Sequence, residues 1–125
     1  MDEYEIYVGL SDSMTREQLF PDERYMRVLK NICRVYHIPF SVAALHGGYF
    51  SADGDFVYEN TLMLRFLEAD RKTVMAIAED LGNFFRQESV MITHRRADVE
   101  FLAPEKFGFD SPEGGADAPE AAPRE

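Results

Sequence analysis

A ferredoxin-like α+β plait is the fold class that this sequence predicts. Two observations lead to it. Segments with alternating apolar residues and segments with helical spacing follow one another in the order βαββαβ. An Asp-Gly pair also marks a hairpin between the second and third strands. We therefore expect a four-stranded antiparallel sheet in the order 4-1-3-2, with two helices on one of its faces.

The first strand and the first helix have the clearest patterns. Apolar residues occupy every second position of 3–10, which predicts a strand with one buried face. A helix starts at Pro21, because the fixed backbone angle of proline suits a first helical turn, and it ends before Pro39. Its apolar residues recur every three or four positions along one face: Tyr25, Val28, Leu29, Ile32, Cys33 and Tyr36.

The next two strands form a hairpin. Apolar segments over 40–46 and 61–67 flank Asp53-Gly54, a strong signal for a two-residue turn because that turn needs positive φ angles. The register set by this turn pairs Phe40 with Leu67, Val42 with Arg65, and Ala44 with Met63. Apolar residues then line both faces of the hairpin.

A second helix and a fourth strand complete the pattern. Asp70 is a candidate N-cap for an amphipathic helix over 71–86. The fourth strand starts at Val90. The segment 98–102 is extended as well, either as a continuation of that strand or as a short fifth strand.

The chain divides into a domain and a tail. Residues 1–102 form the ferredoxin-like domain, and 103–125 form an acidic tail rich in proline, glycine and alanine that we expect to be largely disordered. The formal net charge of the whole chain is −10, of which the tail carries −4. A chain without a basic surface is a poor partner for nucleic acid, so we expect no direct nucleic-acid binding.

Composition also predicts where the protein works. The acidic start of the chain does not resemble a secretion signal, and no apolar segment is long enough for a membrane helix. A lone cysteine, Cys33, excludes a disulfide framework, and its place on the buried stripe of the first helix predicts a structural thiol. We expect a cytoplasmic protein that uses neither a membrane nor a cofactor.

The predicted hairpin has a consequence for assembly. A plait covers only one face of its sheet with helices, so an apolar second face must meet another surface. A second copy of the chain is the simplest partner, and we therefore expect a homodimer that packs sheet to sheet. The alternative is that the tail or the hairpin arm folds over the open face.

Several short segments together resemble a bacterial domain family of unknown function. The segments that carry the resemblance are Tyr7-Val8-Gly9-Leu10, Gly47-Gly48-Tyr49-Phe50 with Asp53-Gly54, Glu59-Asn60-Thr61-Leu62, Phe85-Arg86-Gln87-Glu88-Ser89-Val90 and Val99-Glu100-Phe101. They are spread over most of 4–102. The resemblance implies a ferredoxin-like fold and supplies no activity.

One group of polar residues is a candidate site. In a plait, the start of the third strand and the exit of the second helix lie at the same end of the sheet. This end would gather the candidate catalytic residues Glu59, Glu88, His46 and Tyr49 with the candidate binding residues Asn60, Gln87 and Ser89. Paired carboxylates do acid–base chemistry when burial separates their pKa values. The alternative is that these side chains only cap the helix end and secure the hairpin arm.

Two further groups are weaker candidates. His46, His94 and Glu59 are ligand types that a metal accepts, but no spacing supports a site, so we predict no metal. Four arginines are candidates for an anion-binding patch, although exposed arginines more often serve as salt-bridge donors: Arg65, Arg86, Arg95 and Arg96.

Three classes of function remain open. The absence of a strong catalytic motif and the apolar hairpin favour a non-enzymatic, homodimeric binding or accessory module. The second class is a small dimeric α+β-barrel-type enzyme acting on an organic substrate in the cavity between sheet and helices, and the first residues to test would be Tyr7, His46, Tyr49, Glu59 and Arg65. The third is an acidic phage or mobile-element inhibitor whose partner is a basic, nucleic-acid-binding protein, and it requires acids clustered on one face.

Overall fold

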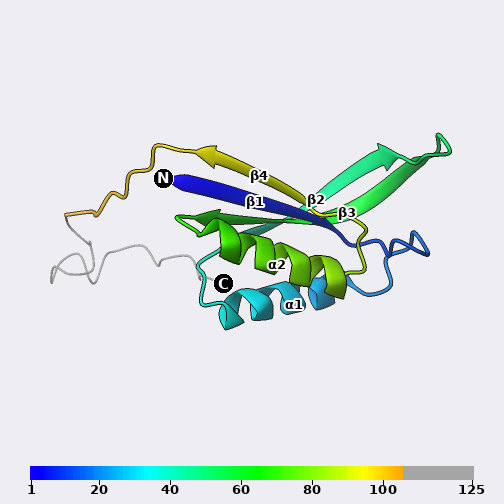
Figure 1. The fold of residues 1–125 in the computed structure, drawn as a ribbon, viewed down its shortest axis with the longest axis horizontal. Coiled ribbons are helices and arrows are strands. Elements are labelled where there is room, and N and C mark those ends of the chain that lie inside the picture. The colour runs from blue at the N-terminus through cyan, green and yellow to red at the C-terminus, as the bar shows by residue number, and fades with distance from the viewer. Residues whose placement is uncertain (106–125) are drawn as a thin grey trace, which may run out of the picture.

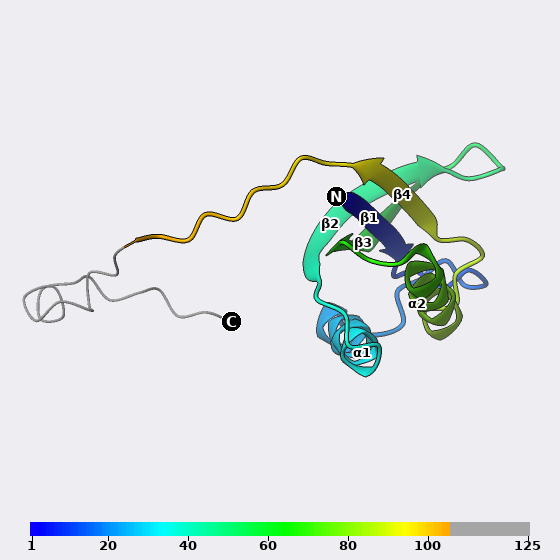
Figure 2. The same cartoon turned by 60° about the vertical axis from the view of Figure 1, so that its left-hand side comes forward.

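The computed structural model describes residues 1–105 and confirms the predicted βαββαβ order (Figure 1). Its elements are β1 (Asp2–Gly9), α1 (Asp22–Val35), β2 (Ser41–Phe50), β3 (Phe56–Leu67), α2 (Arg71–Phe84) and β4 (Met91–Arg96). The strands form one antiparallel sheet in the order β2-β3-β1-β4, which is the predicted order counted from the other edge. Both helices cover the same face of this sheet (Figure 2).

Both helices start where the local sequence predicts, and α2 ends two residues before the predicted end at 86. α1 follows Pro21 directly and carries acidic residues in its first turn, where the helix dipole favours negative charge. Asp70 occupies the N-cap position of α2, and its carboxylate accepts a hydrogen bond from Thr73 at 3.3 Å. Each helix has 14 residues, and among the described residues neither is long and apolar enough to cross a membrane.

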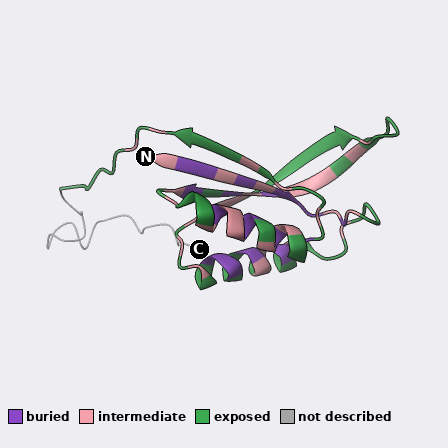
Figure 3. Cartoon of the chain, viewed as in Figure 1, coloured by how far each residue is buried: buried purple, intermediate pink, exposed green. Residues whose placement is uncertain are grey.

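The hydrophobic core lies between the sheet and the two helices (Figure 3). Even-numbered residues of β1 and β3 point toward the helices because side chains alternate along a strand. The helices contribute Tyr25, Leu29, Ile32, Cys33, Val74, Ile77, Ala78 and Leu81. Cys33 is fully buried, and this burial raises the pKa of its thiol to about 11, so the thiol is structural.

Phe66 is the largest fully buried side chain of this core. We expect Phe66→Ala to lower the free energy of unfolding by about 3–5 kcal/mol, through lost burial and the cavity left behind. Urea denaturation of the two proteins measures this difference. A loss below about 1 kcal/mol would mean that the site is loosely packed or hydrated.

The turn of the hairpin differs from the prediction, and the register changes with it. Ser51 and Asp55 close a loop of three residues, Ala52-Asp53-Gly54, in which Gly54 has a φ of +87°. The glycine therefore supplies the left-handed position of a three-residue loop instead of half of a two-residue turn. The predicted pairing is wrong by one residue: Val42 lies opposite Leu64, Ala44 opposite Leu62, and Ser41 opposite Arg65.

This shift changes the composition of the sheet face that no helix covers. Odd-numbered residues of the strands point to this open face, so Arg65 lies there beside Glu5 of β1. Ala43 and Met63 pair with each other next to Tyr7. The open face therefore carries charges toward the start of β1 and apolar side chains toward its end, so only part of it is apolar as the predicted register implied.

The segment 98–102 is not a strand, which corrects the prediction. β4 ends at Arg96, and the next amide, that of Ala97, donates to the carbonyl of Met1. Its partner strand β1 begins at Asp2, so the residues after Ala97 have no strand beside them and their backbone groups stay unpaired in the sheet. Residues 103–105 are exposed. The remainder of the predicted tail, 106–125, lies outside the described residues.

The ends of β2 and β3 form an arm that projects past the helices (Figure 1). Phe56 packs edge-on against both Phe50 and Tyr58 along one side of this arm. Gly48 makes this packing possible, because a methyl group at its position would overlap the Phe56 ring. The opposite side of the arm carries Tyr49 and borders a cleft.

Candidate functional site

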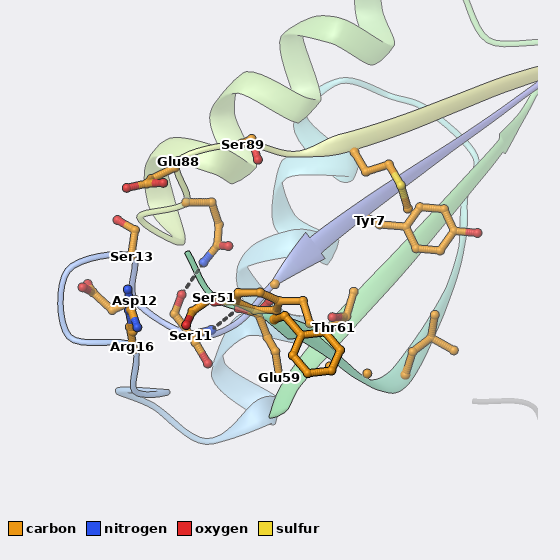
Figure 4. A pocket seen from close by; sticks show the side chains of 18 of the residues that line it. Tyr7, Ser11, Asp12, Ser13, Arg16, Ser51, Glu59, Thr61, Glu88 and Ser89 are labelled. Atoms are coloured by element: carbon orange, nitrogen blue, oxygen red, sulfur yellow. Dashed lines mark hydrogen bonds between the residues drawn. The ribbon is translucent and has the colours of Figure 1, made fainter. Parts of the chain in front are cut away.

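A cleft of about 680 Å³ lies at the end of β1, on the open face of the sheet (Figure 4). All four strands, the loop after β1 and the turn between α2 and β4 contribute to its wall. The apolar end is formed by Tyr7, Leu45 and Met91, and the polar end by residues of the two connections. The sheet therefore presents two different chemical surfaces within one hollow.

Glu59 lies between these two ends. Its carboxylate rests directly over Gly9 of the neighbouring strand, where a methyl group would overlap the carboxylate atoms. The Ser11 backbone N–H donates a hydrogen bond of 3.2 Å to Glu59 Oε2 (Figure 4). Burial raises the pKa of Glu59, and the hydrogen bond from Ser11 lowers it in part. The site thus holds a carboxyl group that water solvates poorly.

Glycine and aromatic residues shape the space around this carboxylate. Gly47 lies directly opposite Glu59 on β2, and its missing side chain leaves open space there. Tyr49 follows on the same strand and is 45% exposed. The Tyr7 hydroxyl donates to Glu5 Oε1 at 3.1 Å, which holds the ring in place at the apolar end. Burial and this hydrogen bond both raise the pKa of Tyr7.

Asp12 organises the loop that carries Ser11. The Asp12 side chain is buried, and Oδ1 accepts hydrogen bonds from the backbone N–H groups of Met14 and Thr15 at 2.8 and 3.1 Å. Arg86 Nε lies 2.7 Å from Oδ2 as an ion pair, without the alignment of a hydrogen bond. The pKa of Asp12 is lowered mainly by the hydrogen bond from the Thr15 backbone. The hydrogen bond from the Met14 backbone and the positive charge of Arg86 lower it further.

The turn between α2 and β4 clamps the same loop. Gln87 Nε2 donates to the Ser11 carbonyl at 2.6 Å, and the Ser13 N–H donates to the Arg86 carbonyl at 3.1 Å. Gln87 therefore positions the Ser11 amide that binds Glu59. Its side chain joins a strand end to a helix end, which is the structural role that the sequence left open as an alternative.

Several of the candidate residues lie together on the cleft, and some do not. Glu59, Glu88, Tyr49, Gln87 and Ser89 all line it. His46 also borders it, but its ring pairs with Asn60 across the strands, with 2.9 Å between His46 Nδ1 and Asn60 Oδ1. Both residues have even numbers, so their side chains leave the strands on the face opposite to Glu59.

Arg65 and Arg95 lie at the other end of the open face, away from the cleft. Arg95 Nε donates to Glu3 Oε1 at 2.5 Å, and Arg95 Nη2 lies 3.8 Å from Glu5 Oε2. Arg96 pairs with Asp2. The arginines considered as an anion-binding patch are therefore spread over both ends of the sheet, and three of the four are matched with acids.

The histidines and Glu59 do not gather around one point either. His94 bonds to Asp2 at 3.0 Å and stacks on the Tyr4 ring, with 4.3 Å between the ring centroids. Across residues 1–105 the structure brings together no group of three His, Cys, Asp or Glu side chains suited to a metal ion.

The residues of the cleft that the sequence did not indicate include Gly9, Ser11, Asp12 and Arg16. Gly9 carried a signal, since glycine inside a strand often marks a close approach by another group. Asp12 is a residue type typical of turns, so the sequence indicates a loop at this position. It does not indicate that Arg86 pairs with Asp12. The position of Ser11 beside Glu59 depends on strand pairing between distant residues and has no local signal.

Neither a protein-family model nor a curated protein matches this sequence. Solved structures do resemble its fold. A phage SAM lyase in the apo state superimposes with a TM-score of 0.60 at 22% identity, covering 85% of this chain and 91% of that chain. A phage SAM lyase in complex with S-methyl-5'-thioadenosine gives 0.60 at 23% identity, covering 85% and 92%. A CutA1 variant from Pyrococcus horikoshii gives 0.51 at 12% identity, covering 81% and 87%. These similarities concern the fold.

Proposed function

We propose that the cleft binds a sulfonium nucleoside, S-adenosylmethionine, and breaks one of its carbon–sulfur bonds to release S-methyl-5'-thioadenosine. The observation that carries the proposal is the partly buried Glu59 carboxylate between an apolar and a polar wall. A sulfonium ion has a positive charge but no hydrogen to donate, so it is best stabilised by a nearby negative charge in poorly solvated surroundings. An adenine ring packs well against aromatic and sulfur-containing side chains such as Tyr7 and Met91.

The dimensions and the fold both support this choice. A volume of about 680 Å³ lies within the range of pockets that enclose small ligands. Phage SAM lyase has a similar fold, and one of its structures holds S-methyl-5'-thioadenosine. At 22–23% identity this likeness suggests the ligand class to test, and the chemistry of the cleft supplies the argument.

The proposed reaction removes the charge that Glu59 attracts. When the bond breaks, its electron pair passes to sulfur and the sulfonium becomes a neutral thioether. The carbon that leaves sulfur is attacked by the substrate's own carboxylate, whose oxygen forms the new carbon–oxygen bond of a lactone, so no proton is gained or lost. Because the sulfonium charge fades as the bond breaks, Glu59 stabilises bound substrate more than the transition state. Its contribution therefore appears in binding, and the neutral product leaves more readily.

The test is to incubate the full chain with S-adenosylmethionine and to follow S-methyl-5'-thioadenosine by liquid chromatography and mass spectrometry. We expect steady release of this product and calorimetrically detectable binding of the substrate. Binding without product would support the non-enzymatic binding module predicted from the sequence. If the chain neither binds S-adenosylmethionine nor releases the product, the proposal is overturned.

This function belongs to the second class that the sequence left open, an enzyme acting on an organic substrate. The site differs from that expectation because the cleft lies on the open face of the sheet and not between sheet and helices. The inhibitor class is less favoured: the acids of β1, Asp2, Glu3 and Glu5, lie beside basic side chains and do not form an uncompensated negative stripe. Membership of the bacterial family of unknown function stays a prediction, and it is compatible with either activity.

Self-association through the open face also stays a prediction. Outside the cleft, this face carries the apolar pair Ala43 and Met63. We expect a homodimer, whose mass light scattering measures at several protein concentrations. Met63→Lys should shift that mass toward the monomer, because it would bury an unpaired charge at the contact while leaving the cleft residues unchanged. A wild-type chain that stays monomeric at the highest concentration would contradict this prediction.

A further inference from the structure

We infer that Arg16 binds the carboxylate of the substrate's amino-acid portion and so determines which way the substrate lies in the cleft. The inference rests on the proposed function. It adds a specificity: the cleft selects sulfonium nucleosides that carry a carboxylate over those that lack one.

The cleft has a graded chemistry along its length. Tyr7, Leu45 and Met91 form one end, and Glu59 lies between them and the loop end. Among the described residues, Arg16 is the only lysine or arginine that lines the cleft, and it lies at the loop end beside Asp12 and Ser13 (Figure 4). The order along the cleft is therefore apolar, negative, positive.

S-adenosylmethionine has the complementary order. Its adenine ring is flat and aromatic, its sulfur is positive, and its chain ends in an α-amino acid that carries a negative carboxylate beside a positive ammonium group. Placing the sulfonium at Glu59 and the adenine at Tyr7 brings the carboxylate to the end that holds Arg16. A guanidinium binds a carboxylate through two parallel hydrogen bonds, which gives the contact a defined geometry as well as a charge.

The guanidinium of Arg16 is available for such a contact. Arg86 already neutralises Asp12 at 2.7 Å, so the nearest buried acid is matched without Arg16. Within residues 1–105 the Arg16 side chain makes no ion pair or hydrogen bond, and it is exposed. Its backbone, by contrast, is held firmly, because the Arg16 N–H donates to the Asp12 carbonyl at 2.7 Å.

The backbone φ angle of Arg16 is unusual for a residue with a side chain. Arg16 has a φ of +61°, in the left-handed region where glycine or asparagine would be less strained. A non-glycine side chain at such a position carries a strain cost, as it also does at His37, Glu68 and Arg86.

The experiment compares three ligands by calorimetry: S-adenosylmethionine, the same sulfonium nucleoside without its carboxylate, and S-methyl-5'-thioadenosine. The full chain is compared with Arg16→Gln and with Arg34→Gln, an equal change of charge at an exposed position of α1. We expect Arg16→Gln to weaken S-adenosylmethionine binding by roughly 10-fold or more. Its affinity for the two ligands without a carboxylate should stay close to that of the wild type, and Arg34→Gln should leave all three affinities unchanged.

A second variant guards against a folding defect. Arg16→Gly also removes the side chain, while glycine relieves the positive φ, so this chain should be at least as stable as the wild type in urea. It should show the same selective loss of affinity as Arg16→Gln. Equal losses for ligands with and without the carboxylate, or no loss in either variant, would overturn the inference. A wild-type chain that binds none of the three ligands would instead overturn the proposed function.

Discussion

Replacing Glu59 with glutamine should lower kcat/KM for cleavage of S-adenosylmethionine by roughly 10- to 100-fold, the value of a charged contact in partly desolvated surroundings. The loss should appear mainly in KM, because the carboxylate attracts a charge that disappears as the bond breaks. Glutamine keeps the size of the side chain and an oxygen that can accept from the Ser11 N–H. The fold should therefore persist.

The pH dependence of binding gives the same residue a second test. Burial raises the pKa of Glu59 above its ordinary value of 4.5, so the wild type should lose affinity as the pH falls through that raised pKa. Glu59→Gln should lose this dependence, whereas Glu100→Gln, an exposed change of equal charge, should keep it. An unchanged KM and pH profile in Glu59→Gln would show that the carboxylate does not hold the substrate.

The raised pKa of Glu59 also affects the free energy of unfolding. A carboxyl group whose pKa is raised by folding binds its proton more tightly in the folded state, so its ionisation at neutral pH opposes folding. We therefore expect Glu59→Gln to have an equal or higher free energy of unfolding at pH 7. This difference should vanish at low pH, where Glu59 is protonated in both the folded and the unfolded chain.

Gly9→Ala should reduce activity about as strongly as Glu59→Gln while changing stability by less than about 1 kcal/mol. The new methyl group would overlap the Glu59 carboxylate, which lies at the end of a flexible side chain and can swing away. Moving it breaks the hydrogen bond from Ser11 and leaves the cleft without its central charge. The kinetics and a urea titration of the variant measure the two effects.

The position of the carboxylate can be followed directly. In Gly9→Ala the displaced Glu59 should be better solvated, so its pKa, followed by NMR of the side-chain carboxyl, should return toward 4.5. Gly47→Ala is the matched control, because a methyl group there would meet only the Glu59 backbone oxygen, at 3.9 Å. The pKa of Glu59 should remain raised in that variant. A raised pKa in Gly9→Ala would contradict the proposed packing.

Most of the fold could be predicted because its signals are local. The alternation over 3–10 and the helical spacing from Tyr25 to Tyr36 both depend only on residues a few positions apart in the chain. Both elements form as expected. The Asp53-Gly54 signal located the hairpin correctly but not its loop length. One residue more in the loop shifts every cross-strand pair, so Val42 faces Leu64 and Arg65 moves beside Ser41.

The sequence by itself determined the order of elements, the buried stripes and the polar residues at one end of the sheet. Only the tertiary structure decided which of those residues share a cleft. Glu59 lies over Gly9 and beside Ser11 because β3 pairs with β1, and these residues are about 50 positions apart in the chain. The pairing of β2 with β3 likewise places His46 opposite Asn60, and the side chains of both residues leave the sheet on the other face. Hydrophobic periodicity reports how each segment meets the core, whereas contacts between distant segments depend on strand register, which a single residue in a turn can change.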